Sequence, residues 1–338
     1  MEISQVIRLV RKCVRNRLPV LLVGAPGVGK SDIVDLVARS ENYDLIISHP
    51  VVADPTDAKG FPAPDASMEF AKFLPYGDLH RALKATKPTI WFLDDLGQAT
   101  PAVQASFMQL LLARRIGEHV LPDCITFVAA TNRKKDRAGV SAILEPVKSR
   151  FVTIINVVPS IDSWIDWALD NDMPGELVAL LRSRPELLLS DTASTDIENT
   201  HSPRTWANAG RLMNIGLDED LEEEALRGAV GPVGCTELVG FLKTWRDMES
   251  PDQVLLNPEK AKIPKTISAL YAMTTALAYY ANTENFDRIL RYAEKLEKNK
   301  QGEFATRMIR DCRRRTPEIA STSAYVTAIT GPLGSLFA

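Results

Sequence analysis

Three glycines, a lysine and a serine are grouped in residues 24–31, which read Gly-Ala-Pro-Gly-Val-Gly-Lys-Ser. Glycine lets successive backbone N–H groups turn inward around the oxygens of a phosphate. In the pattern G-x-x-x-x-G-K-[ST], the lysine, here Lys30, lies against the β- and γ-phosphates of a nucleotide, and the hydroxyl, here of Ser31, binds Mg²⁺. We therefore predict a phosphate site whose binding residues are Gly24, Ala25, Pro26, Gly27, Val28, Gly29, Lys30, Ser31 and Asp32.

The residues on either side of this loop have the patterns of a strand and a helix. Residues 19–23 form a short apolar run typical of a buried parallel strand, and residues 31–38 carry apolar side chains at helical spacing. The loop would then join the end of a strand to the start of a helix. The helix N-terminus would point at the phosphate and favour its negative charge.

Two adjacent carboxylates follow a second apolar run. Residues 90–93 are apolar, and Asp94 and Asp95 come directly after them. An acidic side chain at the carboxyl end of a buried strand can hold Mg²⁺, so Asp94 joins Ser31 as a predicted metal ligand. Asp95 is predicted to orient or deprotonate the attacking water. The alternative is a solvated Asp-Asp turn, and the preceding phosphate loop favours the metal site.

Three further side chains give weaker signals. Asn132 ends the next predicted strand, where its amide could bond the attacking water or the γ-phosphate, although asparagine is common at such turns. Arg150 ends a helix and is a candidate arginine finger for a neighbouring subunit, or a helix-end arginine favoured by the helix dipole. Arg204 lies in the first turn of a helix with a Ser-Pro start and could equally be solvated.

The order of these residues along the chain resembles the AAA+ ATPases, and within them the MoxR-like group. The resemblance covers roughly residues 1–215 and is carried by GAPGVGKS, LDDLGQATPAVQASFMQLLLARRIG, AATNRKKDRAGV, PVKSRF and SPRTW. It implies ATP with Mg²⁺ as the ligand, a ring of six subunits, and an insertion and a hairpin at residues 60–79 and 115–124. It also implies catalytic roles for Asp95, Asn132 (sensor 1), Arg150 (arginine finger) and Arg204 (sensor 2), with Arg133 and Arg137 as second candidates for the finger.

One residue departs from the family pattern. The family has glutamate where this chain has Asp95. The aspartate side chain is shorter by one C–C bond, about 1.5 Å, and a misplacement near 1 Å can lower a rate about 100-fold. Either the loop moves inward to compensate or hydrolysis is slow.

The first half of the chain alternates strand-like and helical patterns, which indicates an α/β fold with a parallel sheet covered on both faces. We predict an AAA+ parallel five-stranded αβα core over residues 1–158, with strands near 20–24, 44–49, 89–94, 125–130 and 152–158. An all-helical lid with Arg204 is predicted over 159–250 and a helical C-terminal region over 265–338. The helical patterns run through 160–183, 203–216, 219–229, 235–248, 265–281, 284–299 and 302–315.

The composition excludes several classes of protein. The chain has 338 residues with 40 basic and 43 acidic side chains, so no overall charge attracts nucleic acid or an anionic membrane. Its four cysteines are far apart and predict reduced thiols rather than disulfides or a zinc site. The N-terminus lacks the uninterrupted apolar stretch of a signal peptide, and no run approaches a membrane span. These features predict a cytoplasmic protein without membrane contact.

The leading functional hypothesis is an oligomeric ATPase that remodels or assembles a protein partner. MoxR-like proteins typically act as chaperone-like ATPases, often with a von Willebrand A-domain partner, which here would be a separate protein because the chain lacks the D-x-S-x-S signature. A nucleic-acid translocase ranks lower, since the hairpin tip at 117–123 is acidic and apolar rather than basic. A nucleotide-gated scaffold with slow hydrolysis is the third hypothesis, motivated by Asp95.

Overall fold

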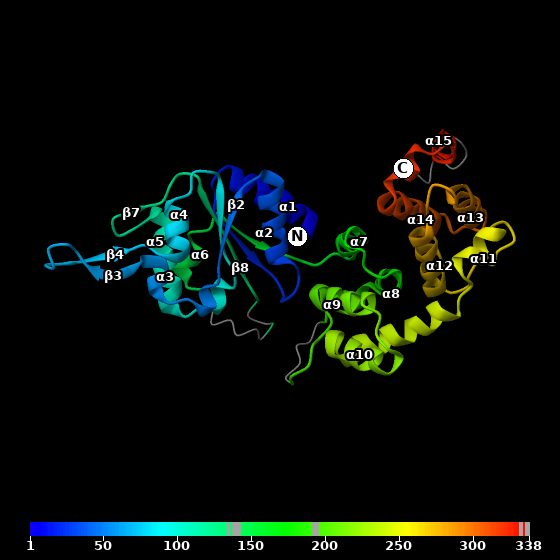
Figure 1. Cartoon of the computed structure of the whole chain (residues 1–338), viewed down its shortest axis with the longest axis horizontal. Coiled ribbons are helices and arrows are strands. Elements are labelled where there is room, and N and C mark those ends of the chain that lie inside the picture. The colour runs from blue at the N-terminus through cyan, green and yellow to red at the C-terminus, as the bar shows by residue number, and fades with distance from the viewer. Residues whose placement is uncertain (134–135, 137–142, 191–195, 331–333, 335–338) are drawn as a thin grey trace. The chain divides into compact units, whose positions relative to one another are not determined.

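The computed structural model describes residues 1–133, 136, 143–190, 196–330 and 334. The chain divides into two compact units, Met1–Ser160 and Ile161–Ala338, called unit 1 and unit 2 below. Unit 1 is an α/β structure, and unit 2 is helical throughout its described part (Figure 1). No helix in the described ranges is both long and apolar enough to cross a membrane.

Unit 1 is built around a sheet of five parallel strands in the order β2-β5-β8-β1-β9. The strands are β1 (Val20–Val23), β2 (Asp44–Ser48), β5 (Thr89–Leu93), β8 (Ile125–Thr131) and β9 (Thr153–Asn156). The central strands β5 and β8 are buried along their whole length, which is why their sequences are nearly continuous apolar runs. The predicted α/β class and the parallel five-stranded core are confirmed.

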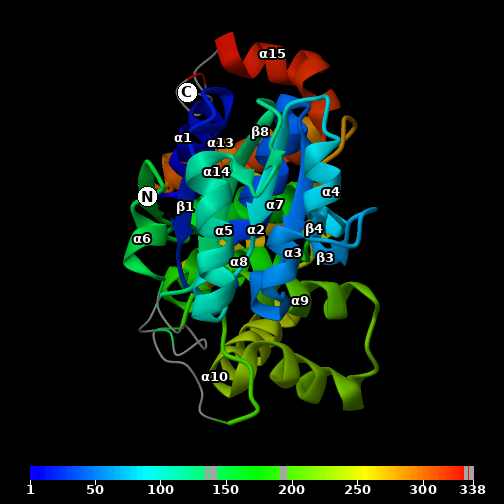
Figure 2. The ribbon, with the colours of Figure 1, turned by 90° about the vertical axis from the view of Figure 1, so that its left-hand side faces the viewer.

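Helices cover both faces of this sheet. Helices α1 (Ile3–Arg15) and α2 (Lys30–Glu41) pack on one face. Helices α4 (Gly77–Leu83) and α5 (Pro101–Ala113) pack on the other, and the short α3 (Pro55–Lys59) lies against both of them; Figure 2 shows these three in front of the sheet. Trp91 on β5 anchors this second layer, since its ring centroid lies 6.3 Å from that of Phe107 on α5 and 5.3 Å from that of Phe127 on β8.

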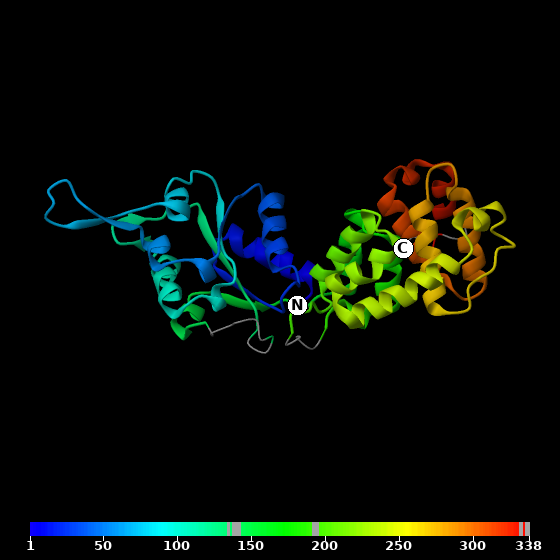
Figure 3. The ribbon, with the colours of Figure 1, turned by 60° about the horizontal axis from the view of Figure 1, so that its bottom comes forward.

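Two hairpins project from unit 1. β3 (Phe61–Pro64) and β4 (Ala71–Leu74) pair antiparallel within the predicted insertion, and β6 (Arg115–Ile116) and β7 (His119–Val120) pair within the second predicted hairpin. The longer hairpin extends away from the rest of unit 1 in Figure 3. Nε2 of His119 lies 2.7 Å from the backbone oxygen of Phe73, so the two hairpins contact each other.

Unit 2 contains helices around two hydrophobic clusters. The first cluster lies among α7 (Ile161–Asp170), α8 (Gly175–Ser183), α9 (Pro203–Asn214) and α10 (Glu219–Asp247). The second lies among α11 (Pro251–Leu256), α12 (Ile267–Tyr280), α13 (Phe286–Lys298), α14 (Gly302–Arg315) and α15 (Ser323–Thr330). The residues expected to form the lid and the C-terminal region are therefore helical, as predicted.

Two helical predictions in unit 2 differ from the structure in detail. The pattern at 160–183 is interrupted between α7 and α8, where Asp172 adopts φ 50° and Pro174 precedes the first turn of α8. The patterns at 219–229 and 235–248 belong to one element, α10, which bends at Gly231 with φ 77° and ψ 172°. Glycine is required at this bend, because a Cβ would lie 2.1 Å from the backbone oxygen of Asn199.

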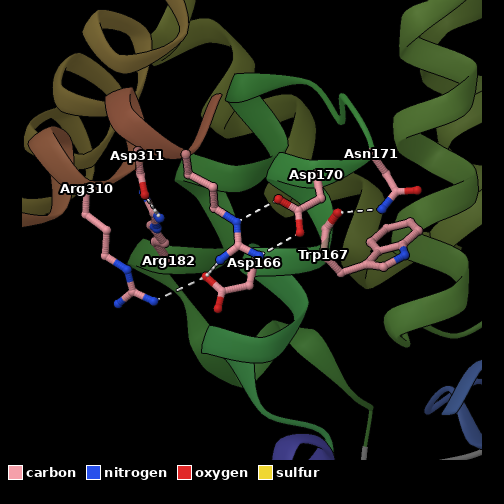
Figure 4. A network of polar contacts seen from close by, with 8 residues as sticks. Asp166, Trp167, Asp170, Asn171, Arg182, Arg310 and Asp311 are labelled. Carbon is pink, nitrogen blue, oxygen red and sulfur yellow. Dashed lines mark hydrogen bonds and ion pairs between the residues drawn. The ribbon is translucent and has the colours of Figure 1, made fainter. Parts of the chain in front are cut away.

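Ion pairs join α14 to α7 and α8 within unit 2. In Figure 4, Asp166 and Asp170 on α7 face α14, which carries Arg310 and Asp311. Arg314 of α14 donates to both Asp170 oxygens, at 2.7 and 2.6 Å, and these bonds lower the pKa of the Asp170 carboxyl. Arg182 and Asp311 form a bidentate pair whose side chains are only 10% and 5% exposed. Asp311 and Arg314 of α14 are thereby engaged in contacts within unit 2.

Replacing Asp311 by alanine is expected to destabilise unit 2 by about 3–5 kcal/mol, because it leaves the Arg182 guanidinium buried without its counter-charge. Urea unfolding followed by tryptophan fluorescence measures this, since four of the five tryptophans lie in unit 2. The control is Glu303→Ala, which removes an exposed pair with Arg307 and should cost below about 0.5 kcal/mol. Equal midpoints for the two variants would contradict the prediction.

Candidate nucleotide-binding site

The predicted phosphate loop lies between the end of β1 and the start of α2. Gly27 and Gly29 adopt φ angles of 74° and 89°, which side-chain-bearing residues rarely adopt, and Gly29 caps α2. A Cβ on Gly24 would lie 3.0 Å from the backbone oxygen of Val157, so this glycine permits a close approach to the chain after β9. Ala25 and Val28 are buried, whereas Pro26 and Asp32 are exposed. The loop thus has the strand–loop–helix setting that anion binding needs.

Lys30 is the first residue of α2 and is only 7% exposed. Its Nζ donates to the backbone oxygens of Gly24 and Ala25, at 3.1 and 3.0 Å, and to Oδ1 of Asn132, at 2.7 Å. The ammonium group is therefore held over the loop itself. The contact with Asn132 links the loop to the end of β8.

The two predicted metal ligands touch one another. The Ser31 hydroxyl donates to Oδ2 of Asp94 at 2.7 Å, and both residues are half-buried. A hydroxyl and a carboxylate are hard oxygen ligands of the kind that Mg²⁺ prefers, so this donor pair fits the metal. The other Asp94 oxygen accepts from the backbone N–H of Asp95 at 3.1 Å.

Asp95 begins the short 3₁₀ turn η2 (Leu96–Gln98) in the left-handed conformation, with φ 56° and ψ 35°. Aspartate tolerates this region better than glutamate does, because its short side chain can bond to nearby polar groups. Oδ1 of Asp95 accepts from Nδ2 of Asn132 at 3.4 Å. The backbone therefore supplies a local reason for an aspartate where the family pattern has glutamate.

Asn132 is the connecting residue of the site. It is 8% exposed and contacts both Lys30 and Asp95. Adjacent strands β1, β5 and β8 thus bring five predicted residues together at their carboxyl ends; these are Lys30, Ser31, Asp94, Asp95 and Asn132. Parallel strands end at the same edge of a sheet, which is where open α/β sheets bind their ligands.

The three arginines are placed differently. Arg150 follows α6 (Glu145–Lys148); its Nη1 donates to Ser149, and its buried Nε has no hydrogen-bond partner among the described residues. Arg133 is committed to a bidentate pair with Asp136, and Arg137 lies outside the described residues. Arg204 lies exposed in the first turn of α9 in unit 2. The roles of Arg150 and Arg204 stay predictions.

Sequence reasoning missed Gly97, which follows the acidic pair. A Cβ on this glycine would lie 2.2 Å from the hydroxyl oxygen of Thr131 at the end of β8. The close approach seats the η2 turn, and with it Asp95, beside Asn132. A glycine two residues after the carboxylates was the only available signal, and its packing partner is remote in sequence.

Replacing Lys30 by alanine is expected to weaken ATP binding about 100-fold, because two charged hydrogen bonds to phosphate would be lost at about 1.5 kcal/mol each. A titration with a fluorescent ATP analogue in the presence of Mg²⁺ measures the affinity. Lys84→Ala, which removes an exposed lysine after α4, is the matched control. An affinity within threefold of the parent for Lys30→Ala would exclude the phosphate role.

The sheet order and the site geometry together agree with the fold and the ligand class expected from the sequence. β1, which leads into the phosphate loop, lies between β9 and β8, and Asn132 directly follows β8. No family model matches the chain. A segment of 170 residues is 29% identical to midasin of Giardia intestinalis, covering 48% of this chain and 3% of midasin. The parallel five-stranded sheet and the contacts of the phosphate loop support an ATP-binding protein with an AAA+ type of fold, and the comparisons do not single out the MoxR-like group.

Two solved structures show a distant likeness to this chain. The RuvB Holliday junction branch migration motor of Thermotoga maritima is 13% identical with a TM-score of 0.41, covering 81% of this chain and 80% of that one. NtrX of Brucella abortus in complex with ADP is 13% identical with a TM-score of 0.42, covering 99% and 68%. These scores are too low to assign a function.

Proposed function

We propose that this protein is an oligomeric ATPase that uses ATP hydrolysis to remodel or assemble a separate protein partner. The observation that carries the proposal is the contact network of Lys30, Asn132 and Asp95 beside the pair of Ser31 and Asp94. The resemblance to MoxR-like proteins implies three further features. These are a ring of six subunits, a chaperone-like activity and a client protein with a von Willebrand A domain.

Each residue of the network would have a separate role in ATP binding or hydrolysis. The loop N–H groups and Lys30 bind the phosphates, and Ser31 and Asp94 would hold Mg²⁺. Bound Mg²⁺ would neutralise charge on the β- and γ-phosphate oxygens. Asp95 would accept the proton of the attacking water, which Asn132 orients. Arg150 of a neighbouring subunit and Arg204 would then stabilise the charge that develops on the γ-phosphate.

The surface of the two hairpins favours a protein client over nucleic acid. Large apolar side chains are exposed on the longer hairpin, including Phe61 at 61%, Met68 at 76% and Phe70 at 59%. Val120 on the shorter hairpin is 63% exposed, and the flanking Glu118 is acidic. A surface that binds nucleic acid needs lysine and arginine side chains to contact the phosphate backbone. Exposed apolar surface is typical of protein–protein contacts.

Two measurements on the purified chain test the proposal. Steady-state phosphate release should require ATP and Mg²⁺, and mass photometry should show a ring that forms or tightens with ATP. Addition of single-stranded DNA is the control for the translocase hypothesis and should leave the rate unchanged. DNA binding that weakens with salt and raises turnover would replace the proposed client by nucleic acid.

A nucleotide-gated scaffold with slow hydrolysis is the second candidate function. Asp95 favours it, because the shorter carboxylate could fail to reach the attacking water. The two candidates share the ATP site and differ only in turnover.

A further inference from the structure

Ser48, the last residue of β2, connects three parts of unit 1. Its hydroxyl donates to Oδ2 of Asp78 at 2.6 Å and accepts from the indole N–H of Trp91 at 2.9 Å. Its backbone oxygen accepts from the backbone N–H of Asp94 at 2.9 Å. Ser48 is only 8% exposed, so these contacts are shielded from competing water.

The backbone hydrogen bond from Asp94 to Ser48 fixes the position of the chain at Asp94, the predicted metal ligand. β2 and β5 are paired from Asp44–Thr89 to Ser48–Leu93, and the bond from Asp94 to Ser48 is the next one along this ladder. Beyond it the chain leaves the strand, because Asp95 takes the left-handed conformation. The position of Ser48 therefore sets where Asp94 presents its carboxylate to Ser31.

Asp78 ties this point to the hairpin β3–β4. It lies in the first turn of α4, four residues after the end of β4, and its other oxygen pairs with Arg81 at 3.1 Å. Tyr76 lies between the end of β4 and Asp78 in the sequence, and its hydroxyl donates to Asp57 of α3 at 2.9 Å. Hydrogen bonds of Asp78 with Ser48 and of Tyr76 with Asp57 therefore fix the start of α4 next to the base of the hairpin.

We propose that Asp78 and Ser48 are positioning residues that hold Asp94 in place for Mg²⁺ binding, and that they link this carboxylate to the base of the β3–β4 hairpin. The inference rests on the proposed ATPase function. Removal of either side chain breaks the hydrogen bond between Ser48 and Asp78 and loosens the end of β2. Among the described residues, neither side chain forms a hydrogen bond with the phosphate loop, so both act through Asp94.

Four variants of the full chain test the positioning role. Ser48→Ala and Asp78→Ala are expected to lower turnover about tenfold, the effect of a sub-ångström misplacement, and to raise the Mg²⁺ concentration for half-maximal activity several-fold. ATP affinity measured in EDTA should stay unchanged. Asp78→Asn keeps an oxygen that accepts from Ser48 and should remain near the parent. Arg81→Gln removes the exposed pair with Asp78 and is the matched control.

The double variant Ser48→Ala/Asp78→Ala should show the loss of one single variant, because the two residues act as a unit. A lower melting temperature with unchanged Mg²⁺ dependence and turnover would mean a merely structural role and would overturn the proposal. Additive losses in the double variant would overturn it as well.

If the parent shows no turnover, the ATPase function itself fails. The readout is then the gain in ATP affinity on adding Mg²⁺, which Ser48→Ala and Asp78→Ala should reduce and Asp78→Asn should preserve.

Discussion

Replacing Arg150 by alanine is expected to lower ATP turnover about 1,000-fold or more while ATP affinity stays nearly intact, the effect typical of an arginine finger. The guanidinium makes only a local bond to Ser149, and among the described residues no carboxylate pairs with it. Its charge is therefore available to a neighbouring γ-phosphate. Phosphate release and a nucleotide titration on the same preparation separate the two effects, with the exposed Arg8→Ala as the control.

Mixing two inactive variants tests whether Arg150 acts on a neighbouring subunit. Arg150→Ala subunits keep an intact phosphate loop, and Lys30→Ala subunits keep an intact Arg150. In an equal mixture about a quarter of the head-to-tail interfaces would combine both intact halves, so turnover should partly return. No recovery in mixed rings would place Arg150 in its own subunit's site. Equal loss of affinity and turnover in the single variant would exclude the finger role altogether.

Replacing Asp95 by asparagine is expected to lower turnover by about 100- to 10,000-fold, since the water would lose its proton acceptor. ATP affinity should remain, because Asp95 contacts Asn132 and Asp94 rather than the phosphate loop. Single-turnover phosphate release measures the loss. Asp123→Asn changes an 87% exposed aspartate elsewhere in unit 1 and is the control. Retained turnover in Asp95→Asn would require another general base.

The variant Asp95→Glu separates the ATPase from the scaffold. Glutamate reaches further but fits the left-handed conformation at this position less well, at a cost of about 1 kcal/mol. We expect turnover within about tenfold of the parent, because the two effects oppose each other. A gain of 100-fold or more would mean that the natural chain is arrested by its aspartate. That outcome favours the nucleotide-gated scaffold.

Local patterns predicted the strands, the loop and the residues at the sheet edge. The apolar runs before Gly24 and Asp94 identified β1 and β5 because a parallel strand covered on both faces must be apolar throughout. The break between α7 and α8 was missed, although Pro174 lies there, because the apolar spacing continues across it. The bend of α10 likewise depends on Asn199, which is remote in the sequence from Gly231.

The phosphate loop, the acidic pair and the α/β class could be predicted from the amino-acid sequence, because each depends on residue types at short, fixed spacings. The contacts of Asn132 with Lys30 and Asp95, and of Ser48 with Asp78 and Asp94, could not be predicted in this way and are seen only in the folded chain. These contacts join segments that are far apart in the chain, and the order of strands in the sheet brings them together. The left-handed backbone at Asp95 is also a tertiary result, since the turn it begins is seated by Gly97 against Thr131.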